Sequence, residues 1–216
     1  MIDIGSVNGN RAAQLVQNHK NVHVFCFDPL EECHSLALQL AEKESRMHVF
    51  KAAVASRPGE LPFYCANDRS SCSLLPWGTA EAIKSWKYPP GKIHFKTTGV
   101  RQVQAIRMDK FLIDRRIARI MFVRIETQGT ALDVLKSFGN QIGNVMEFAI
   151  KVHVTDFDVY QNQTHKTDLV EYMNEHGFSI YNTKPQSQNQ EEVIWFVNRS
   201  CMKQSAAAAG FTHNDL

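Results

Sequence analysis

The sequence has 216 residues, 44% hydrophobic and 21% charged, which is the balance of an ordinary globular domain. Its 24 basic and 22 acidic residues are interleaved and leave a formal charge of +2, so neither nucleic acid nor an anionic membrane surface is an expected partner. No apolar run approaches the roughly 18 residues that span a membrane, and the length suits a single α/β domain.

The five cysteines are widely spaced and form no C-x-x-C pair, so we expect reduced, mostly buried thiols, which favours the cytoplasm. Only Met1 to Ile4 precede the first glycine, whereas a strand usually has about 5 residues. We therefore expect a truncated N-terminus. A missing segment could carry a signal or an anchor, so the compartment stays open.

The first half of the chain alternates between strand and helix patterns. After a strand that ends at Ile4, the apolar spacing predicts these elements in order: a helix near 12–16, a strand over 22–27, a helix over 30–43 and a strand over 47–50. This alternation predicts a parallel sheet. Residues 55–98 are broken by prolines and glycines, and we expect a hairpin around 57–59 followed by a mobile loop.

Regular patterns return in the second half. They predict strands over 100–106, 120–125 and 145–154, and helices over 108–114, 130–138 and 166–176. Two further strands, 178–181 and 193–197, flank a polar loop and should pair antiparallel, since no helix separates them. We expect one domain over 1–198 and a loosely ordered tail over 199–216.

The opening stretch IDIGSVNGN places Asp3 and Gly5 at the end of the first strand, where open α/β sheets bind ligands. A dinucleotide fingerprint would need G-x-G-x-x-G, and here the glycines are spaced as Gly5 and Gly9. A carboxylate at Asp3 would repel a pyrophosphate but suit the ammonium group of S-adenosylmethionine. Asp28, at the end of the second strand, could accept hydrogen bonds from both ribose hydroxyls of either cofactor.

A block in the second half favours the methyl donor. Residues 125–129, IETQG, followed by Leu132, Val134 and Leu135, resemble a block typical of the FkbM family of S-adenosylmethionine-dependent methyltransferases. Further segments fall in that family's order, and the ordered combination is more specific than any single motif. These segments are 52–54 with Gly59, 71–74, 108–112 and 177–178.

The resemblance implies a class I methyltransferase fold, a Rossmann-like doubly wound sheet of seven strands that is mostly parallel with an antiparallel last strand. It also implies S-adenosylmethionine as cofactor and a set of cofactor-binding residues. Those positions are Asp3, Gly5, Asn8, Gly9, Asp28, Ala53 and, more weakly, Ser73. The sequence departs from the family at Val7, where an asparagine is usual, at Arg124 and Glu126 in place of lysine and aspartate, and at Lys151 in place of glutamate.

Methyl transfer to a hydroxyl needs a positioned acceptor and a base. The candidates are Glu126 at a strand end and His153, with Asp156 and Asp158 as lesser options. No metal site is expected, because the histidine and cysteine spacings point to different faces. We therefore expect a methyltransferase, most simply an O-methyltransferase acting on a small molecule or glycan, without nucleic-acid or membrane contact. A non-catalytic relative that only binds ligand is the alternative, and a dehydrogenase is the third option.

Overall fold

The computed structural model describes residues 1–87 and 97–204. Its main sheet has seven strands in the order β3-β2-β1-β7-β8-β10-β9. β10 runs antiparallel to both of its neighbours, whereas the other described pairs of this sheet are parallel. The predicted seven-stranded, doubly wound arrangement is therefore confirmed. In sheet order the strands are β3 (Met47–Phe50), β2 (Val24–Phe27), β1 (Ile2–Ile4), β7 (Ile120–Ile125), β8 (Val145–His153), β10 (Glu191–Asn198) and β9 (Phe178–Gln186).

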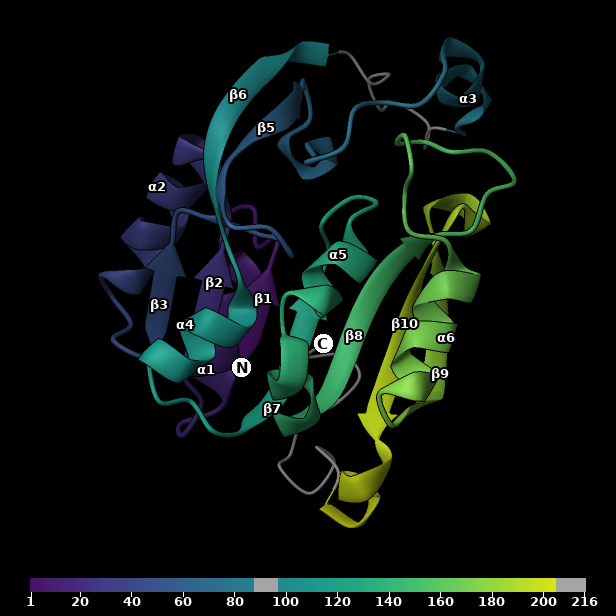
Figure 1. The fold of residues 1–216 in the computed structure, drawn as a ribbon. Coiled ribbons are helices and arrows are strands. Elements are labelled where there is room, and N and C mark those ends of the chain that lie inside the picture. Colours follow the sequence, from purple (N-terminus) through teal and green to yellow (C-terminus); the bar gives the residue numbers. More distant parts are fainter. Residues whose placement is uncertain (88–96, 205–216) are drawn as a thin grey trace.

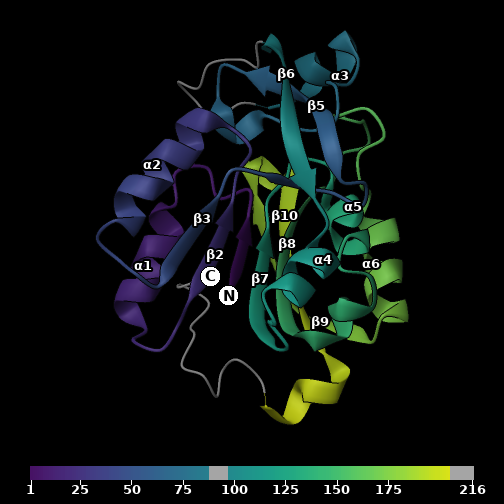
Figure 2. The ribbon, with the colours of Figure 1, turned by 60° about the vertical axis from the view of Figure 1, so that its left-hand side comes forward.

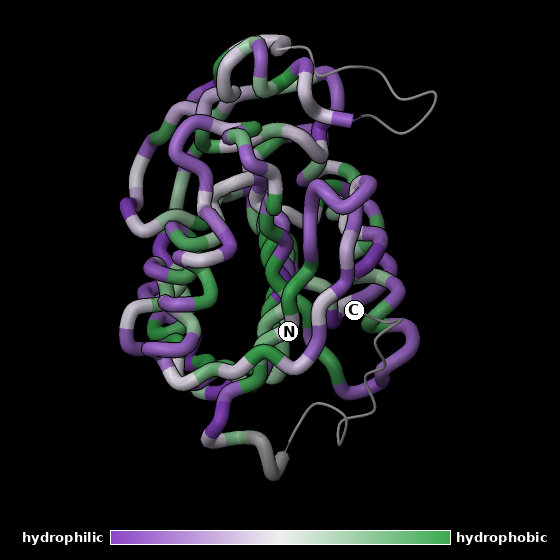
Figure 3. Tube along the Cα trace, turned by 90° about the vertical axis from the view of Figure 1, so that its right-hand side faces the viewer, coloured by the Kyte–Doolittle hydropathy of each residue, from purple (hydrophilic) through white to green (hydrophobic). Residues whose placement is uncertain are grey.

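Helices cover both faces of this sheet, as Figure 2 shows. One face carries α1 (Asn10–Asn18) and α2 (Glu31–Ala41), and the other carries α4 (Met108–Asp114), α5 (Ala131–Lys136) and α6 (Lys166–Glu175). The hydrophobic segments gather in the strands at the centre, while the outer helical turns are largely hydrophilic (Figure 3). Strands buried on both faces carry continuous apolar runs, and β7 does so with the sequence IMFVRI.

The largest core cluster lies between the sheet and α4, α5 and α6. It includes the fully buried side chains of Met108, Val134 and Phe138, packed against strand residues such as Phe148 and Phe196. The opposite face has a smaller cluster, in which Leu15 and Val16 of α1 contact the sheet beside Ala37 of α2. These two layers fix the positions of the strand ends from which the site is built.

A second, three-stranded sheet lies over the carboxyl ends of the parallel strands, at the top of Figure 1. It consists of β4 (Ala53–Val54), β6 (Thr97–Ile106) and β5 (Gly59–Ala66), with α3 (Ala80–Ser85) nearby in the chain. The predicted hairpin around 57–59 was wrong. The strands on either side of that turn do not pair with each other, because both pair with the distant β6, β4 in parallel and β5 antiparallel.

The remaining expectations for the chain have mixed outcomes. β9 and β10 pair antiparallel as predicted, but β9 extends to Gln186 and takes in part of the expected polar loop. The expected tail begins with a 3₁₀ helix, Arg199–Gln204, whose first amide donates to the carbonyl of Gly177 at 2.9 Å. The rest of that tail lies outside the described residues, as do residues 88–96 of the expected loop.

Candidate functional site

The glycine turn after β1 brings main chain close to main chain. Gly5 has φ of +82°, and its amide donates to the carbonyl of Phe27 at 3.0 Å. A Cβ at Gly5 would lie 2.3 Å from the carbonyl oxygen of Glu126, so only glycine fits there. Gly9, with φ of +72°, precedes α1, and a Cβ there would clash with Met47 and Ala37.

Asp28 follows β2 and holds the glycine turn in place. Its two carboxylate oxygens accept hydrogen bonds from the amides of Val7 and Leu30, each at 3.0 Å. Burial raises the pKa of Asp28 to about 6, although these backbone donors oppose the rise. The carboxyl group is therefore positioned by the backbone on two sides and keeps lone pairs for further donors.

A first cavity opens between these groups and the small sheet. It encloses about 40 Å³ and lies between the ends of β1, β2 and β7 and a roof formed by β5 and residues 69–74. Three of the residues expected to bind the cofactor line it, Gly5, Asp28 and Ala53, together with the candidate base Glu126. The other lining residues are mainly apolar and include Leu30, Phe63, Cys72 and Leu74.

Asp3 lies in the middle of β1 and is fully buried. Its Oδ1 accepts from Arg124 Nη1 at 2.7 Å, while Oδ2 has no hydrogen-bond partner among the described residues. Arg124 also pairs with Glu126, at 2.5 Å, so one guanidinium bridges the carboxylates of two neighbouring strands. Asp3 is not among the residues that line the first cavity, and its role toward an ammonium group stays a prediction.

Glu126 follows β7 and faces the first cavity. Burial alone would raise its pKa, but Arg124 outweighs that effect, with help from Lys151 and Arg11, and holds the pKa below its usual value. The carboxylate is therefore ionised at neutral pH. It supplies negative charge beside a cavity whose other walls are mostly apolar.

The remaining predicted cofactor residues do not face the first cavity. Asn8 is exposed, and its Oδ1 accepts from the Asn10 amide at 3.1 Å. Ser73 is fully buried, donating to the Gln128 carbonyl at 2.7 Å and accepting from the Leu75 amide at 3.0 Å. Ser73 therefore ties the roof to the turn after β7, a contact that the sequence motif did not indicate.

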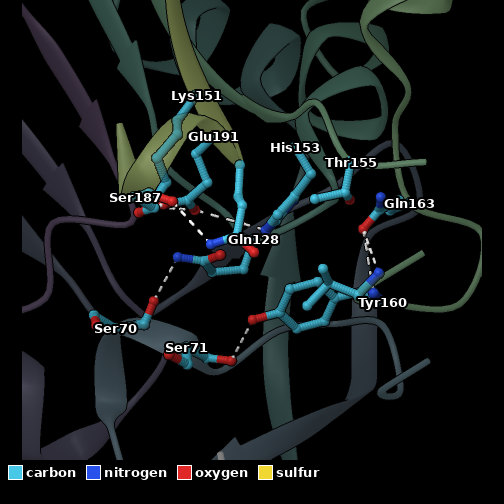
Figure 4. A network of polar contacts seen from close by, with 12 residues as sticks. Ser70, Ser71, Gln128, Lys151, His153, Thr155, Tyr160, Gln163, Ser187 and Glu191 are labelled. Carbon is cyan, nitrogen blue, oxygen red and sulfur yellow. Dashed lines mark hydrogen bonds and ion pairs between the residues drawn. The ribbon is translucent and has the colours of Figure 1, made fainter. Parts of the chain in front are cut away.

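Gln128 makes a second link between the roof and that turn. Its Nε2 donates to the carbonyl of Ser70 at 2.6 Å, and its own φ is +51°. Nearby, the hydroxyl of Tyr160 donates to the carbonyl of Ser71 at 2.8 Å (Figure 4). Sequence reasoning matched Gln128 to the family block but assigned it no contact, because its partners come from a segment more than fifty residues away.

His153, the other candidate base, ends β8 in a buried polar cluster (Figure 4). Its Nε2 lies 3.6 Å from Glu191, which also pairs with Lys151 at 3.3 Å. The ring packs between Trp86 and Tyr160, and its Nδ1 has no hydrogen-bond partner among the described residues. Burial lowers the pKa of His153 to about 4, and Lys151 adds to that effect while Glu191 opposes it. His153 does not line the first cavity.

A second, larger cavity of about 580 Å³ adjoins the first. It lies between the small sheet, the turn and helix after β7, and the segment that leads into α6. Leu74 and Thr130 line both cavities, so the two share a wall. Sequence reasoning did not find this cavity, whose lining comes from four separate segments.

The structure describes some of the aromatic residues of segment 55–98. Trp77 and Trp86 are buried and belong to the core cluster beneath the small sheet, and Trp77 stacks on Tyr160 at 4.7 Å between centroids. Tyr88 and Phe95 lie outside the described residues. Within 1–87 and 97–204, no group of three His, Cys, Asp or Glu side chains could hold a metal ion. The described helices are all too short or too polar to cross a bilayer.

Comparisons with known proteins agree with this geometry. A model of the methyltransferase FkbM domain matches residues 3–180. The 2-O-methyltransferase NoeI of Sinorhizobium fredii (strain NBRC 101917 / NGR234) is 22% identical over 164 residues, which cover 76% of this chain and 66% of that protein, just under two thirds of its length.

Two of the solved structures that resemble the fold serve as examples. One is M. capricolum TrmK in complex with S-adenosyl-homocysteine, with a TM-score of 0.51 and 14% identity, covering 91% of this chain and 61% of that chain. The other is a protein of the NADB-Rossmann superfamily from Streptococcus agalactiae, with a TM-score of 0.50 and 11% identity, covering 98% of this chain and 70% of that chain. At these identities the likeness concerns the fold alone.

Proposed function

The chain belongs to the FkbM family of methyltransferases, for which S-adenosylmethionine is the expected cofactor, and we propose that its methyl acceptor is a hydroxyl group of a small molecule or sugar. The observation that carries this proposal is the first cavity, in which Gly5, Asp28 and Glu126 meet at the carboxyl ends of three strands. The relative NoeI supports the choice of oxygen, since it is named a 2-O-methyltransferase.

The residues of the first cavity fit the cofactor chemically. Asp28 presents a carboxylate for ribose hydroxyls, Leu30 and Phe63 supply apolar walls for an adenine ring, and Glu126 supplies charge opposite to a sulfonium or ammonium group. The close backbone approach at Gly5 leaves room that a side chain would fill. The cavity volume of about 40 Å³ is well below the roughly 300–1,000 Å³ of small-molecule sites, so we propose that the roof segment 69–74 moves outward when the cofactor enters.

When bound, the cofactor supplies a methyl group activated by a sulfonium. The chain's own task is to position the acceptor, exclude water and take up the hydroxyl proton. Glu126 Oε1 or Oε2 is the better placed group for that proton, because Glu126 lines the first cavity and is ionised. His153 stays a second candidate, neutral at pH 7 and so able to accept a proton.

Calorimetric titration of the protein with S-adenosylhomocysteine tests the cofactor site. We expect saturable binding. If a folded sample gives no heat of binding, the proposed cofactor site is wrong. The variant Asp3→Asn tests the ammonium assignment: affinity should fall about tenfold, as for a lost charged hydrogen bond. An analogue of S-adenosylhomocysteine without the amino group should bind both forms equally. If the variant binds the parent compound as well as the wild type does, Asp3 has no such role.

Transfer of a labelled methyl group then tests the base. We expect Glu126→Gln to lower kcat by about 100-fold, a larger factor than its effect on affinity for S-adenosylhomocysteine, and His153→Asn to have a smaller effect on kcat. If His153→Asn lowers kcat more than Glu126→Gln does, His153 is the base that takes up the hydroxyl proton. Both groups have a pKa below neutrality and are therefore weak bases, which makes a non-catalytic binding protein the second candidate function. Cofactor binding without transfer to any saccharide or phenol would support that second candidate.

A further inference from the structure

The second cavity has the dimensions of a ligand site. Its volume of about 580 Å³ falls within the range of small-molecule pockets, whereas the volume of the first cavity is far smaller. Leu74 and Thr130 line both cavities. A molecule in the second cavity would therefore lie directly beside whatever occupies the first.

The lining of the second cavity combines polar and apolar side chains and carries no net formal charge. Two cationic side chains, Arg57 and Lys136, are matched by two carboxylates, Asp133 and Asp168. Asp133 is already engaged, since it accepts hydrogen bonds from the amide and the hydroxyl of Ser56. Such a surface does not attract a polyanion, because nucleic-acid binding needs an excess of basic side chains along the backbone path. Apolar groups such as Leu61, Leu75 and Leu132 complete the wall.

Gln163 lines the second cavity and carries an unused donor. Its side chain is held by the preceding loop, because Oε1 accepts from the amides of Val159 and Tyr160 at 3.1 and 3.2 Å (Figure 4). The residue is only 3% exposed, and its Nε2 has no hydrogen-bond partner among the described residues. An unpaired buried amide donor is costly in a folded protein. A ligand oxygen that reaches Nε2 from the cavity would satisfy it.

We propose that the second cavity binds the methyl acceptor and that this acceptor is a neutral, hydroxyl-rich molecule of saccharide size. The inference rests on the proposed function, which it deepens by naming the substrate class. Amide, carboxylate and guanidinium groups around an apolar wall offer many donors and acceptors to hydroxyl groups without selecting for charge. Gln163 Nε2 is the group that orients the acceptor through one of its oxygens.

Saturation-transfer NMR on the full chain tests the cavity directly, with glucose, galactose, N-acetylglucosamine and cellobiose as probes. We expect at least one saccharide to bind the wild type. Leu132→Trp fills the cavity and should weaken that binding at least tenfold, while Leu36→Trp, on the exposed side of α2, should leave it unchanged. No signal from any of the four saccharides, or equal signals for both tryptophan variants, would overturn the proposal.

Gln163→Glu isolates the amide donor. The new carboxylate can still accept from the two backbone amides, but it can no longer donate to a ligand. We expect saccharide affinity to fall about tenfold, the loss of one hydrogen bond, with Gln14→Glu on the exposed face of α1 as the matched control. Unchanged affinity in a folded Gln163→Glu variant would contradict the assigned role.

Two further arms separate this inference from the proposed function. Saccharide binding is measured with and without S-adenosylhomocysteine, so a failure of the cofactor site leaves the saccharide result readable. Fluorescence anisotropy with a labelled RNA hairpin tests the other acceptor class, and RNA binding that Leu132→Trp abolishes would overturn the saccharide assignment. If Lys151→Met loses saccharide binding while Leu132→Trp retains it, the acceptor site lies at the β8 edge instead.

Discussion

The two cavities that meet at Leu74 and Thr130 are built in different ways. In the first, main-chain contacts fix the key positions: a glycine packs against a carbonyl, and a carboxylate is held by two backbone amides. The second is formed by side chains from segments far apart in the sequence. Main-chain construction tolerates little substitution and leaves a motif in the sequence. Side-chain construction tolerates change and leaves none, so cofactor sites are easier to infer than acceptor sites.

The largest expected effect comes from the backbone contact in the first cavity. Gly5→Ala forces a Cβ to within 2.3 Å of the Glu126 carbonyl oxygen at a φ of +82°. We expect the free energy of unfolding to fall by more than about 3 kcal/mol and cofactor binding to be lost. Urea denaturation and calorimetry with S-adenosylhomocysteine measure the two effects.

Gly177→Ala is the matched control for that substitution. Gly177 has a similar φ of +88°, but a Cβ there would meet nothing within 4 Å. Only the conformational cost remains, about 1–2 kcal/mol, and cofactor affinity should not change. Equal destabilisation by the two substitutions would show that the close approach at Gly5 does not matter.

The next effect concerns the carboxylate of the first cavity. Asp28→Asn removes a charged acceptor and places an amide donor opposite a backbone donor. We expect affinity for S-adenosylhomocysteine to fall about 10- to 100-fold, the range for hydrogen bonds to charged groups, by calorimetry. Affinity for the saccharide probe should stay within twofold, since Asp28 does not line the second cavity. A fall in both affinities would show that the cofactor and the saccharide share one site.

Asp28 also predicts a pH dependence of stability. Its folded pKa of about 6 lies above the usual 3.8, so the folded state holds the proton more tightly than the unfolded chain does. The stabilisation that protonated Asp28 contributes is therefore fully present below about pH 4 and is lost as the pH rises to about 6. The free energy of unfolding should fall by about 3 kcal/mol over this range, at 1.36 kcal/mol per pKa unit. Urea denaturation of wild type and Asp28→Asn between pH 4 and 7 measures the difference. Parallel curves would contradict the raised pKa.

The smallest effect is expected in the second cavity. Asp168→Asn changes an exposed side chain of α6, so the free energy of unfolding should stay within about 0.5 kcal/mol. Saccharide affinity should fall about threefold by NMR titration, because one acceptor for ligand hydroxyls is weakened. Asp114→Asn, an exposed aspartate of α4 outside both cavities, serves as control. Destabilisation comparable to that of Gly5→Ala would contradict the contrast between the cavities.

The sequence predicted most strands of the main sheet because each is an apolar run between a helix and a turn. It misjudged the small sheet, since the partner of β5 lies some forty residues further along the chain, across a segment with many prolines and glycines. Local patterns carry no information on such pairing. Register and partner depend on packing over the strand ends, which emerges only in the folded chain.

The same limit applies to the site. Gly5, Asp28 and Ala53, named from the glycine turn and the family resemblance, line the first cavity, and their role toward the cofactor stays a prediction. Ser73 was assigned to the cofactor because its segment resembles the family, yet its hydroxyl links the roof to Gln128. Gln163 gave no signal, because its significance depends on a loop that occupies one end of its amide and leaves the other unpaired.

The shared wall has a thermodynamic consequence. Leu74 and Thr130 belong to both cavities, so a ligand that displaces them from one side changes the free energy of occupying the other. Such a coupling is reciprocal: the factor by which the methyl donor alters affinity for the acceptor equals the factor by which the acceptor alters affinity for the donor. For the proposed donor and acceptor sites, displacement of these two residues would make occupancy of one depend on occupancy of the other.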